Sequence, residues 1–250
     1  MTTFNIKGIS VLLAMPAHRD ISPYTVCALL QTQEALWEKG IPYELKMYTG
    51  GSCITVARSK ITAEFLKGDH TKLFFIDSDM VWKPEDVMRM IALSAVMHVV
   101  CAPYTARCDP PQFLMSLPEE FEANEYGCFP IEGVGLGFTI VSREVIEKLA
   151  AKAQKLRFSA QGELVPHIFR FGSFGDEWMG EDIGFFEDIR ALGYEVNLDP
   201  TIVLGHIGTK TYQAAFMDML QQRATIIDPV EVAAVSAGNA RKAPQKVGAL

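Results

Sequence analysis

Two carboxylates stand one residue apart directly after a short hydrophobic run. Residues 73–76 are Leu-Phe-Phe-Ile, and Asp77, Ser78 and Asp79 follow. Carboxylate oxygens bind hard divalent cations such as Mg²⁺ or Mn²⁺, which keep positions open for phosphate oxygens. Asp is also a common turn residue, so a strand that ends in a turn is the better explanation of this pattern when it is taken alone.

A second acidic pair and a single histidine also lie at the ends of predicted elements. Glu181 and Asp182 follow Gly180 at the start of a predicted helix, where acidic side chains interact favourably with the helix dipole. His206 follows the last predicted strand, in what we expect to be a polar turn. Each feature has an ordinary structural explanation, but together they place carboxylates and an imidazole where an α/β sheet binds ligands.

The first hundred residues alternate between strand and helix patterns, which predicts a parallel, doubly wound sheet flanked by helices. We expect the first strand to end at Pro16. The first helix should carry its stripe at helical spacing on Val26, Leu29, Leu30, Gln33, Leu36 and Trp37. The expected strands cover residues 10–15, 43–48, 73–76 and 99–102, with helices in the three intervals between them.

The second half has a weaker pattern. We expect a strand at 135–141, a helix at 144–152, little regular structure at 153–180, a helix from 180 to about 192 and a strand that ends near Leu204. Residues 1–227 are predicted to form one domain, and residues 228–250, poor in large apolar groups, a loosely attached and flexible tail.

Composition restricts the classes of protein that fit. The chain has 250 residues, 49% of them hydrophobic, a net charge of −7 and a pI of about 5.3, which argues against bulk electrostatic binding of nucleic acid. The five cysteines are scattered and show no zinc-ribbon spacing. There is no signal peptide pattern and no apolar run of roughly 18 residues, so we expect a soluble, cytoplasmic protein with no transmembrane segment.

The order of these features resembles that of the GT-A fold glycosyltransferases, particularly the family 2-like group. The residues that carry the resemblance are Leu12 to Pro16, the Asp-X-Asp motif at 77–79, Glu181-Asp182, His206, Thr55 to Ser59 and the glycine-rich stretch Gly133 to Phe138. The stretch from Thr55 is similar to an Ala-Arg-Asn sequence common in the family, with Ser59 in place of the asparagine.

The resemblance implies a metal-dependent enzyme that transfers a sugar from a nucleotide-sugar, with a UDP-sugar favoured, and that uses Mn²⁺ or Mg²⁺. Asp79 and His206 would bind the metal, and Asp77 would contact the metal or the donor ribose. Asp182 would be the general base if the reaction inverts configuration, with Glu181 orienting the acceptor or capping its helix. The nucleotide-sugar pocket would include Pro16, Ala17, His18, Arg19, Arg58, Asp77 and Ser78.

The stretch from Phe171 to Trp178 is rich in glycine and aromatic residues and precedes the acidic pair. This composition predicts a mobile loop that closes over the donor and excludes water, with Trp178 offering a face on which a sugar can stack. An ordinary surface loop with a buried anchor would have the same composition.

Two other functions fit parts of the sequence. A nucleotidyltransferase also pairs carboxylates around Mg²⁺, but it usually has a glycine-rich basic loop after its first strand, and Pro16 to Asp20 contains no glycine. A non-catalytic nucleotide-sugar binding module would have no need for the base at Glu181-Asp182. The acceptor could be a glycan, a lipid or a protein; a modified DNA base, bound through residues 103–115 and Arg107, fits the acidic chain less well.

Overall fold

A mostly parallel sheet of seven strands forms the centre of the molecule. The computed structural model describes residues 4–118, 122–174 and 176–226. The strand order is β2-β1-β3-β9-β5-β14-β7, with β9 and β7 antiparallel to their neighbours. The strands are β1 (Val11–Ala17), β2 (Tyr43–Thr49), β3 (Lys72–Ile76), β5 (Val99–Cys101), β7 (Phe129–Ile131), β9 (Phe138–Ser142) and β14 (Val196–Leu198). The mixed α/β class predicted from the sequence is confirmed.

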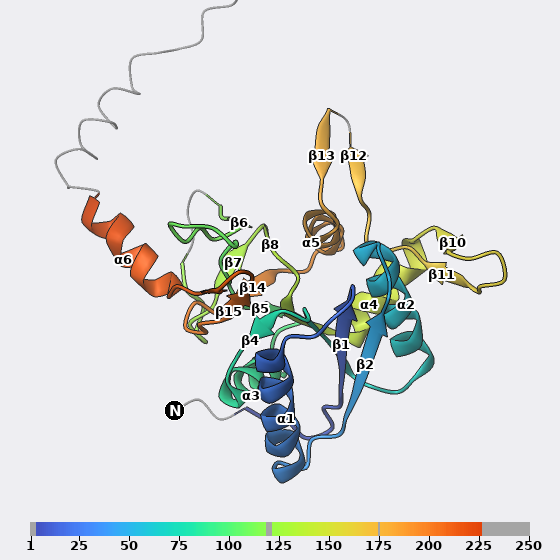
Figure 1. The fold of residues 1–250 in the computed structure, drawn as a ribbon, viewed down its shortest axis with the longest axis horizontal. Coiled ribbons are helices and arrows are strands. Elements are labelled where there is room, and N and C mark those ends of the chain that lie inside the picture. Colours follow the sequence, from blue (N-terminus) through green and yellow to red (C-terminus); the bar gives the residue numbers. More distant parts are fainter. Residues whose placement is uncertain (1–3, 119–121, 175, 227–250) are drawn as a thin grey trace, which may run out of the picture.

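Helices cover both faces of this sheet and create two hydrophobic layers (Figure 1). One layer packs against α1 (Pro23–Glu38) and α3 (Pro84–Leu93) and contains Phe74. The other packs against α2 (Ile54–Lys67), α4 (Arg143–Lys152) and α5 (Glu181–Ala191) and contains Phe75. Successive side chains of a strand point to opposite faces, so a continuous apolar run such as β3 is buried on both sides.

The first strand does not end at Pro16, as the sequence predicts, but continues to Ala17. Pairing of β1 with β3 stops at Ala14, while pairing with β2 continues to Ala17. Pro16 therefore lies where the strand keeps a partner on one side only. A missing backbone N–H is tolerated at such a position.

The buried face of α1 matches the predicted one only in part. Leu29 and Leu36 are buried, but Val26, Leu30 and Trp37 are exposed, Trp37 to 79%. Small polar residues are buried instead: Thr25 donates a hydrogen bond to the carbonyl of Met80, and Thr32 accepts one from the Trp82 indole, which is also buried. Because these hydroxyls are satisfied internally, the helix can turn its larger apolar groups outward.

Short strands connect regions where the sequence shows little periodicity. The hairpin β10 (Lys155–Arg157) with β11 (Leu164–Pro166), and the hairpin β12 (Gly172–Phe174) with β13 (Glu177–Met179), occupy the stretch in which we expect little regular structure. Figure 1 shows the β12–β13 hairpin projecting beyond α5. The second half also contains β6 (Met115–Ser116), which pairs with β8 (Gly133–Val134), and the helix α6 (Phe216–Ile226).

A three-stranded sheet brings residues 205–212 next to the Asp-X-Asp segment. It consists of β4 (Met80–Val81), β15 (Gly205–Ile207) and β16 (Thr211–Tyr212) in the order β16-β15-β4. His206 thus lies on a strand, which corrects the predicted turn. Its partner Met80 is more than a hundred residues earlier in the chain, so no local sequence pattern could indicate this pairing.

Residues 228–250, predicted as a flexible tail, lie outside the described residues. Among the helices that the structure describes, none combines the length and the apolar character needed to cross a membrane.

Candidate active site

The second aspartate of the Asp-X-Asp segment lies beside His206. Pairing between β4 and β15 sets this contact, and the backbone N–H of Ile207 donates to the carbonyl of Asp79 (2.8 Å). As a result, His206 Nε2 and Asp79 Oδ2 are 3.7 Å apart. The structure therefore brings together two of the three residues predicted to bind a metal.

The proton on His206 is fixed by its other ring nitrogen. Nδ1 lies 2.8 Å from the carbonyl oxygen of Thr105, which can only accept a hydrogen bond, so Nδ1 carries the proton. Burial lowers the pKa of His206, which favours the neutral ring even though the hydrogen bond to Thr105 opposes this shift. The unprotonated Nε2 then faces the carboxylate oxygen of Asp79. Two acceptors that face each other in this way are suited to share a cation.

Arg107 occupies this region in the structure. Its guanidinium forms an ion pair with Asp79 through Oδ2, the same oxygen that faces His206. The sequence suggested Arg107 only as a possible contact to DNA. Because residues 103–132 show no helix or strand periodicity, no pattern linked Arg107 to Asp79.

Asp77 belongs to a different cluster, centred on Arg58. Arg58 donates to Asp77 through Nη2 (3.0 and 3.3 Å to the two carboxylate oxygens) and to Glu181 through Nη1 (2.5 Å). Its side chain is only 3% exposed. Burial alone would lower the pKa of Arg58, but the carboxylates of Asp77 and Glu181 raise it above its usual value. Arg58 thus ties the end of β3 to the start of α5.

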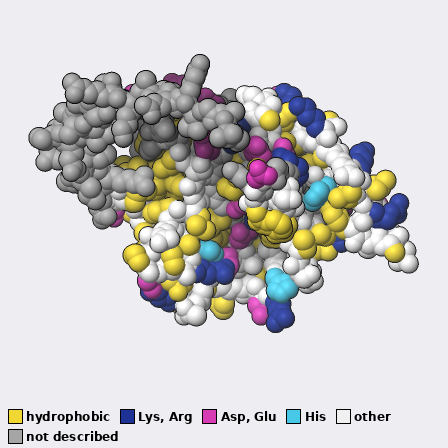
Figure 2. Space-filling view, turned by 90° about the horizontal axis from the view of Figure 1, so that it is seen from above, with side chains coloured by type: hydrophobic (Ala, Val, Ile, Leu, Met, Phe, Trp, Pro, Cys, Tyr) yellow, Lys and Arg dark blue, Asp and Glu magenta, His cyan; other side chains and the backbone are white. Residues whose placement is uncertain are grey.

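The family resemblance places Arg58 in the nucleotide pocket. In the structure, its two terminal nitrogens bind the carboxylates of Asp77 and Glu181. Arg58 therefore positions these two acids. In the view from above, Asp and Glu side chains run across the middle of the surface with Lys or Arg side chains beside them (Figure 2).

Two glycines of the predicted glycine-rich strand give this cluster its space. A Cβ at Gly137 would lie 2.7 Å from Oδ2 of Asp77, and one at Gly135 would collide with the hydroxyl of Tyr104. The N–H of Gly137 donates to that hydroxyl (3.3 Å), while its carbonyl accepts from the N–H of Asp77. Burial and the nearby Asp77 carboxylate raise the pKa of Tyr104 far above its usual range, so Tyr104 stays a neutral phenol. Sequence reasoning did not identify Tyr104.

Of the neighbouring acids Glu181 and Asp182, the predicted base Asp182 is the one that no ion pair among the described residues holds. It is half-buried at the first turn of α5, and its Oδ1 accepts a hydrogen bond from the N–H of Ile183 (2.9 Å). Within the described part of the chain, no cationic side chain forms an ion pair with it. Glu181, by contrast, is held by Arg58.

The residues predicted to line the nucleotide pocket surround the end of β1. Pro16 and Ala17 are buried in the strand, while His18 and Arg19 are exposed in the loop that follows. Nδ1 of His18 lies 3.0 Å from the carbonyl oxygen of Gly51. The loop reaches the Asp-X-Asp turn where the N–H of Ser22 donates to the carbonyl of Ser78 (3.3 Å).

Trp178 lies on the β12–β13 hairpin and is 70% exposed. Its ring meets that of Phe171, also exposed, edge to face at 5.3 Å between centroids. The predicted loop is therefore a hairpin that presents two aromatic rings, and it lies directly before Glu181 and Asp182 in the chain.

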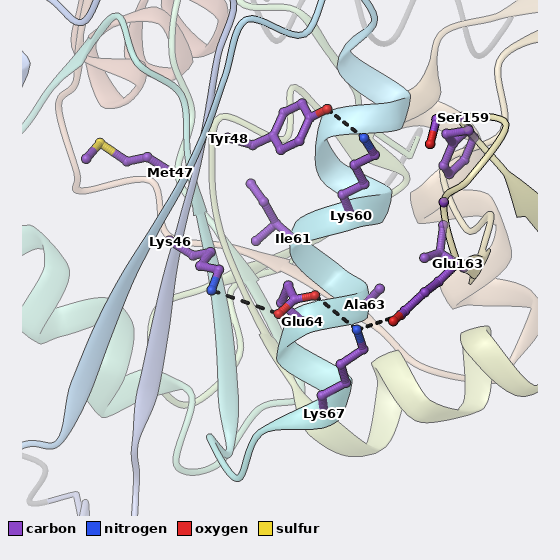
Figure 3. Close-up of a pocket in the computed structure, with 13 residues that line it drawn as sticks. Lys46, Met47, Tyr48, Lys60, Ile61, Ala63, Glu64, Lys67, Ser159 and Glu163 are labelled. Atoms are coloured by element: carbon purple, nitrogen blue, oxygen red, sulfur yellow. Dashed lines mark hydrogen bonds and ion pairs between the residues drawn. The ribbon is translucent and has the colours of Figure 1, made fainter.

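A cavity of about 370 Å³ opens elsewhere, between β2, the outer side of α2 and the β10–β11 hairpin (Figure 3). Lys60 lines it and donates to the hydroxyl of Tyr48 (2.8 Å), while Lys67 pairs with Glu64 and Glu163. Residues 58 and 60 lie about 200° apart around a helix, so this cavity and the Arg58 cluster are on different sides of α2. None of the predicted site residues lines it.

The three predicted metal ligands do not form one cluster. Within residues 4–118, 122–174 and 176–226, no three His, Cys, Asp or Glu side chains are grouped as metal ligands. Asp79 and His206 face each other, but Asp77 turns to Arg58. Asp79 and His206 are therefore the two predicted ligands that the structure places side by side.

Comparison with known proteins places the fold in a wider group. No protein-family profile matches the chain, and no curated protein does. A crystal structure of A197 from STIV matches with a TM-score of 0.52 and 20% identity over 80% of this chain and 86% of that one. GalNAc-T7 with UDP, GalNAc and Mn²⁺ matches with a TM-score of 0.50 and 9% identity over 80% of this chain and 43% of that one. The catalytic domain of Drosophila beta1,4galactosyltransferase 7 matches with a TM-score of 0.45 and 13% identity over 83% and 71%.

At these identities the matches describe architecture and not reaction. The order of the strands, the helices on both faces and the match to GalNAc-T7 lead to one conclusion: the chain has the GT-A fold of glycosyltransferase domains.

Proposed function

We propose that the protein is a glycosyltransferase that takes a sugar from a nucleotide-sugar donor, with a UDP-sugar favoured, and that it depends on Mn²⁺ or Mg²⁺. The observation that carries this proposal is the pair Asp79 and His206: a carboxylate oxygen and an unprotonated ring nitrogen 3.7 Å apart. Asp79 follows β3, at the carboxyl end where an α/β sheet binds ligands, and the pairing of β15 with β4 brings His206 beside it.

The two residues fit a divalent cation. Ligand bonds of about 2.1 Å allow two ligand atoms to be up to about 4.2 Å apart, which includes the observed separation. The Nδ1–H of His206 donates to the carbonyl of Thr105; metal-binding histidines usually donate a hydrogen bond from the ring nitrogen that does not bind the metal. Few protein ligands suit a cation that binds substrate phosphates, because water and phosphate oxygens complete its coordination. When bound, such a cation neutralises charge on the leaving diphosphate.

The surrounding residues would then orient the donor. Arg58 holds Asp77 at the end of β3, where its carboxylate could accept hydrogen bonds from the ribose hydroxyls or contact the cation. His18, Arg19 and Ser78 would line the nucleotide pocket from the loop after β1 and the Asp-X-Asp turn. Trp178 would stack against a sugar.

Asp182 would act as the general base of an inverting reaction. It lies at the first turn of α5, and its carboxylate pairs with no cation among the described residues. It could therefore accept the proton of an acceptor hydroxyl as that oxygen attacks the anomeric carbon. Glu181 would support this arrangement through its ion pair with Arg58.

A screen of UDP-, GDP- and dTDP-sugars with Mn²⁺ tests the reaction. We expect Mn²⁺-dependent release of free nucleoside diphosphate from one donor class, and loss of that release in excess EDTA. A nucleotidyltransferase would release pyrophosphate from a nucleoside triphosphate instead, and a binding module would bind a donor without releasing anything. Full turnover in EDTA would contradict the metal dependence.

A further inference from the structure

We propose that Arg107 holds the place of the cation in the metal-free protein, and that a divalent cation must displace it from Asp79 in order to bind. This inference rests on the proposed function, because it concerns the same Asp79–His206 pair. It adds a competition between a protein side chain and the metal that neither the fold nor the matches describe.

The contact itself indicates competition. Arg107 binds Oδ2 of Asp79, and that same oxygen is the one that faces Nε2 of His206. A cation bound between Oδ2 and Nε2 would lie against the guanidinium, and two positive charges on one carboxylate oxygen repel each other. The ion pair and the metal complex are therefore alternative states of the same atoms.

The chain around Arg107 is built to place it there. The base of its loop is closed by the N–H of Ala106, which donates to the carbonyl of Gln112 (2.8 Å). Gly208 leaves room for the arginine stem, because a Cβ at that position would lie 2.9 Å from Cδ of Arg107. The same loop supplies the Thr105 carbonyl that binds His206. The loop that contains Thr105 and Arg107 therefore contacts both His206 and Asp79.

The exposure of Arg107 makes displacement feasible. Its side chain is 46% exposed and that of Asp79 is 31% exposed, so the ion pair is partly solvated and moving the guanidinium into water loses little free energy. The arginine would screen the Asp79 carboxylate before the metal arrives, and it would weaken metal binding in the absence of nucleotide.

The test is a titration with Mn²⁺ in the absence of nucleotide. The electron paramagnetic resonance signal of free Mn²⁺ measures how much of the metal is bound. Arg107→Gln should bind Mn²⁺ up to about fivefold more tightly than the wild type, since loss of a half-exposed ion pair typically changes an affinity by no more than this factor. Arg107→Lys keeps the charge and should stay closer to the wild type.

Lys210→Gln is the matched control. Lys210 is a cation on the neighbouring turn, paired with Asp109 (2.6 Å) and not with Asp79, so its removal changes the local charge without opening the pair. We expect its Mn²⁺ affinity to stay within about twofold of the wild type. An equal gain in both variants would mean that only general electrostatics is at work and would overturn the proposal.

A second measurement covers stability. Without metal, Arg107→Gln leaves Asp79 unpaired, so the rise in Tm on adding Mn²⁺ should be larger than in the wild type. If the wild type binds Mn²⁺ and Arg107→Gln binds it no more tightly, the inference fails while the proposed function stands. If Asp79→Asn binds Mn²⁺ as well as the wild type does, the proposed metal site fails, and the inference with it.

Discussion

Replacing Arg58 with methionine tests how strongly the Asp77–Arg58–Glu181 cluster stabilises the fold. The change keeps most of the side-chain volume but leaves two carboxylates without their shared partner. Removing one partner of a buried ion pair costs about 3–5 kcal/mol. Asp77 and Glu181 are 25% and 15% exposed, so water can solvate them in part, and we take the lower end, about 3 kcal/mol.

The assay is urea unfolding followed by circular dichroism at pH 7, without metal or nucleotide. Lys60→Met is the matched control, since Lys60 is two residues later on α2 and donates only to the hydroxyl of Tyr48. Its loss should cost about 1 kcal/mol or less. The double variant Arg58→Met/Glu181→Gln should recover part of the stability, because it removes one of the stranded charges.

A loss below about 1 kcal/mol in Arg58→Met would refute this reasoning. So would a double variant that is less stable than Arg58→Met, because removal of the Glu181 charge would then not relieve the cost of leaving it without a partner.

Three further outcomes follow from the site. Asp182→Asn should lower kcat by about 10²–10⁴-fold while Mn²⁺-dependent UDP affinity stays unchanged, as measured with the acceptor that the donor screen identifies; a near-normal kcat would end the assignment of the base. Gly137→Ala places a Cβ 2.7 Å from Asp77 and should cost about 1–3 kcal/mol in urea unfolding, whereas Gly68→Ala, whose Cβ would meet no atom closer than 3.9 Å, is the control. Trp178→Ala should change the unfolding free energy by less than about 0.5 kcal/mol because Trp178 is 70% exposed, yet raise KM for the donor several-fold; an unchanged KM would argue against stacking.

The sequence predicts the sheet and the acidic motif well because their signals are local. Residues 73–76 form an uninterrupted apolar run, so the strand and the two aspartates at its end follow directly. The start of α5 at Glu181 is also marked locally, by acidic residues after a glycine. The glycines at 135 and 137 were visible, and the structure adds that they make room for Tyr104 and Asp77.

The rest of the site depends on contacts between distant parts of the chain. Arg58 has the sequence context of an ordinary helix residue, and only the packing of α2 against β3 and α5 shows that it is buried. Arg107 and Thr105 lie in a stretch with no periodicity. Arg107 contacts Asp79, which follows β3, and Thr105 contacts His206 on β15. The buried face of α1 was predicted only in part: Leu29 and Leu36 are buried, but satisfied threonines replace the other large apolar residues there.

The central claim is that Asp79 and His206 hold the cation to which a nucleotide diphosphate binds. Isothermal titration calorimetry of UDP, with and without Mn²⁺, on the wild type and on His206→Ala tests it most directly. We predict that UDP binds the wild type only with Mn²⁺, and that His206→Ala loses this Mn²⁺-dependent binding while it remains folded. UDP binding of equal affinity without Mn²⁺, or unchanged Mn²⁺-dependent binding in His206→Ala, would contradict the account.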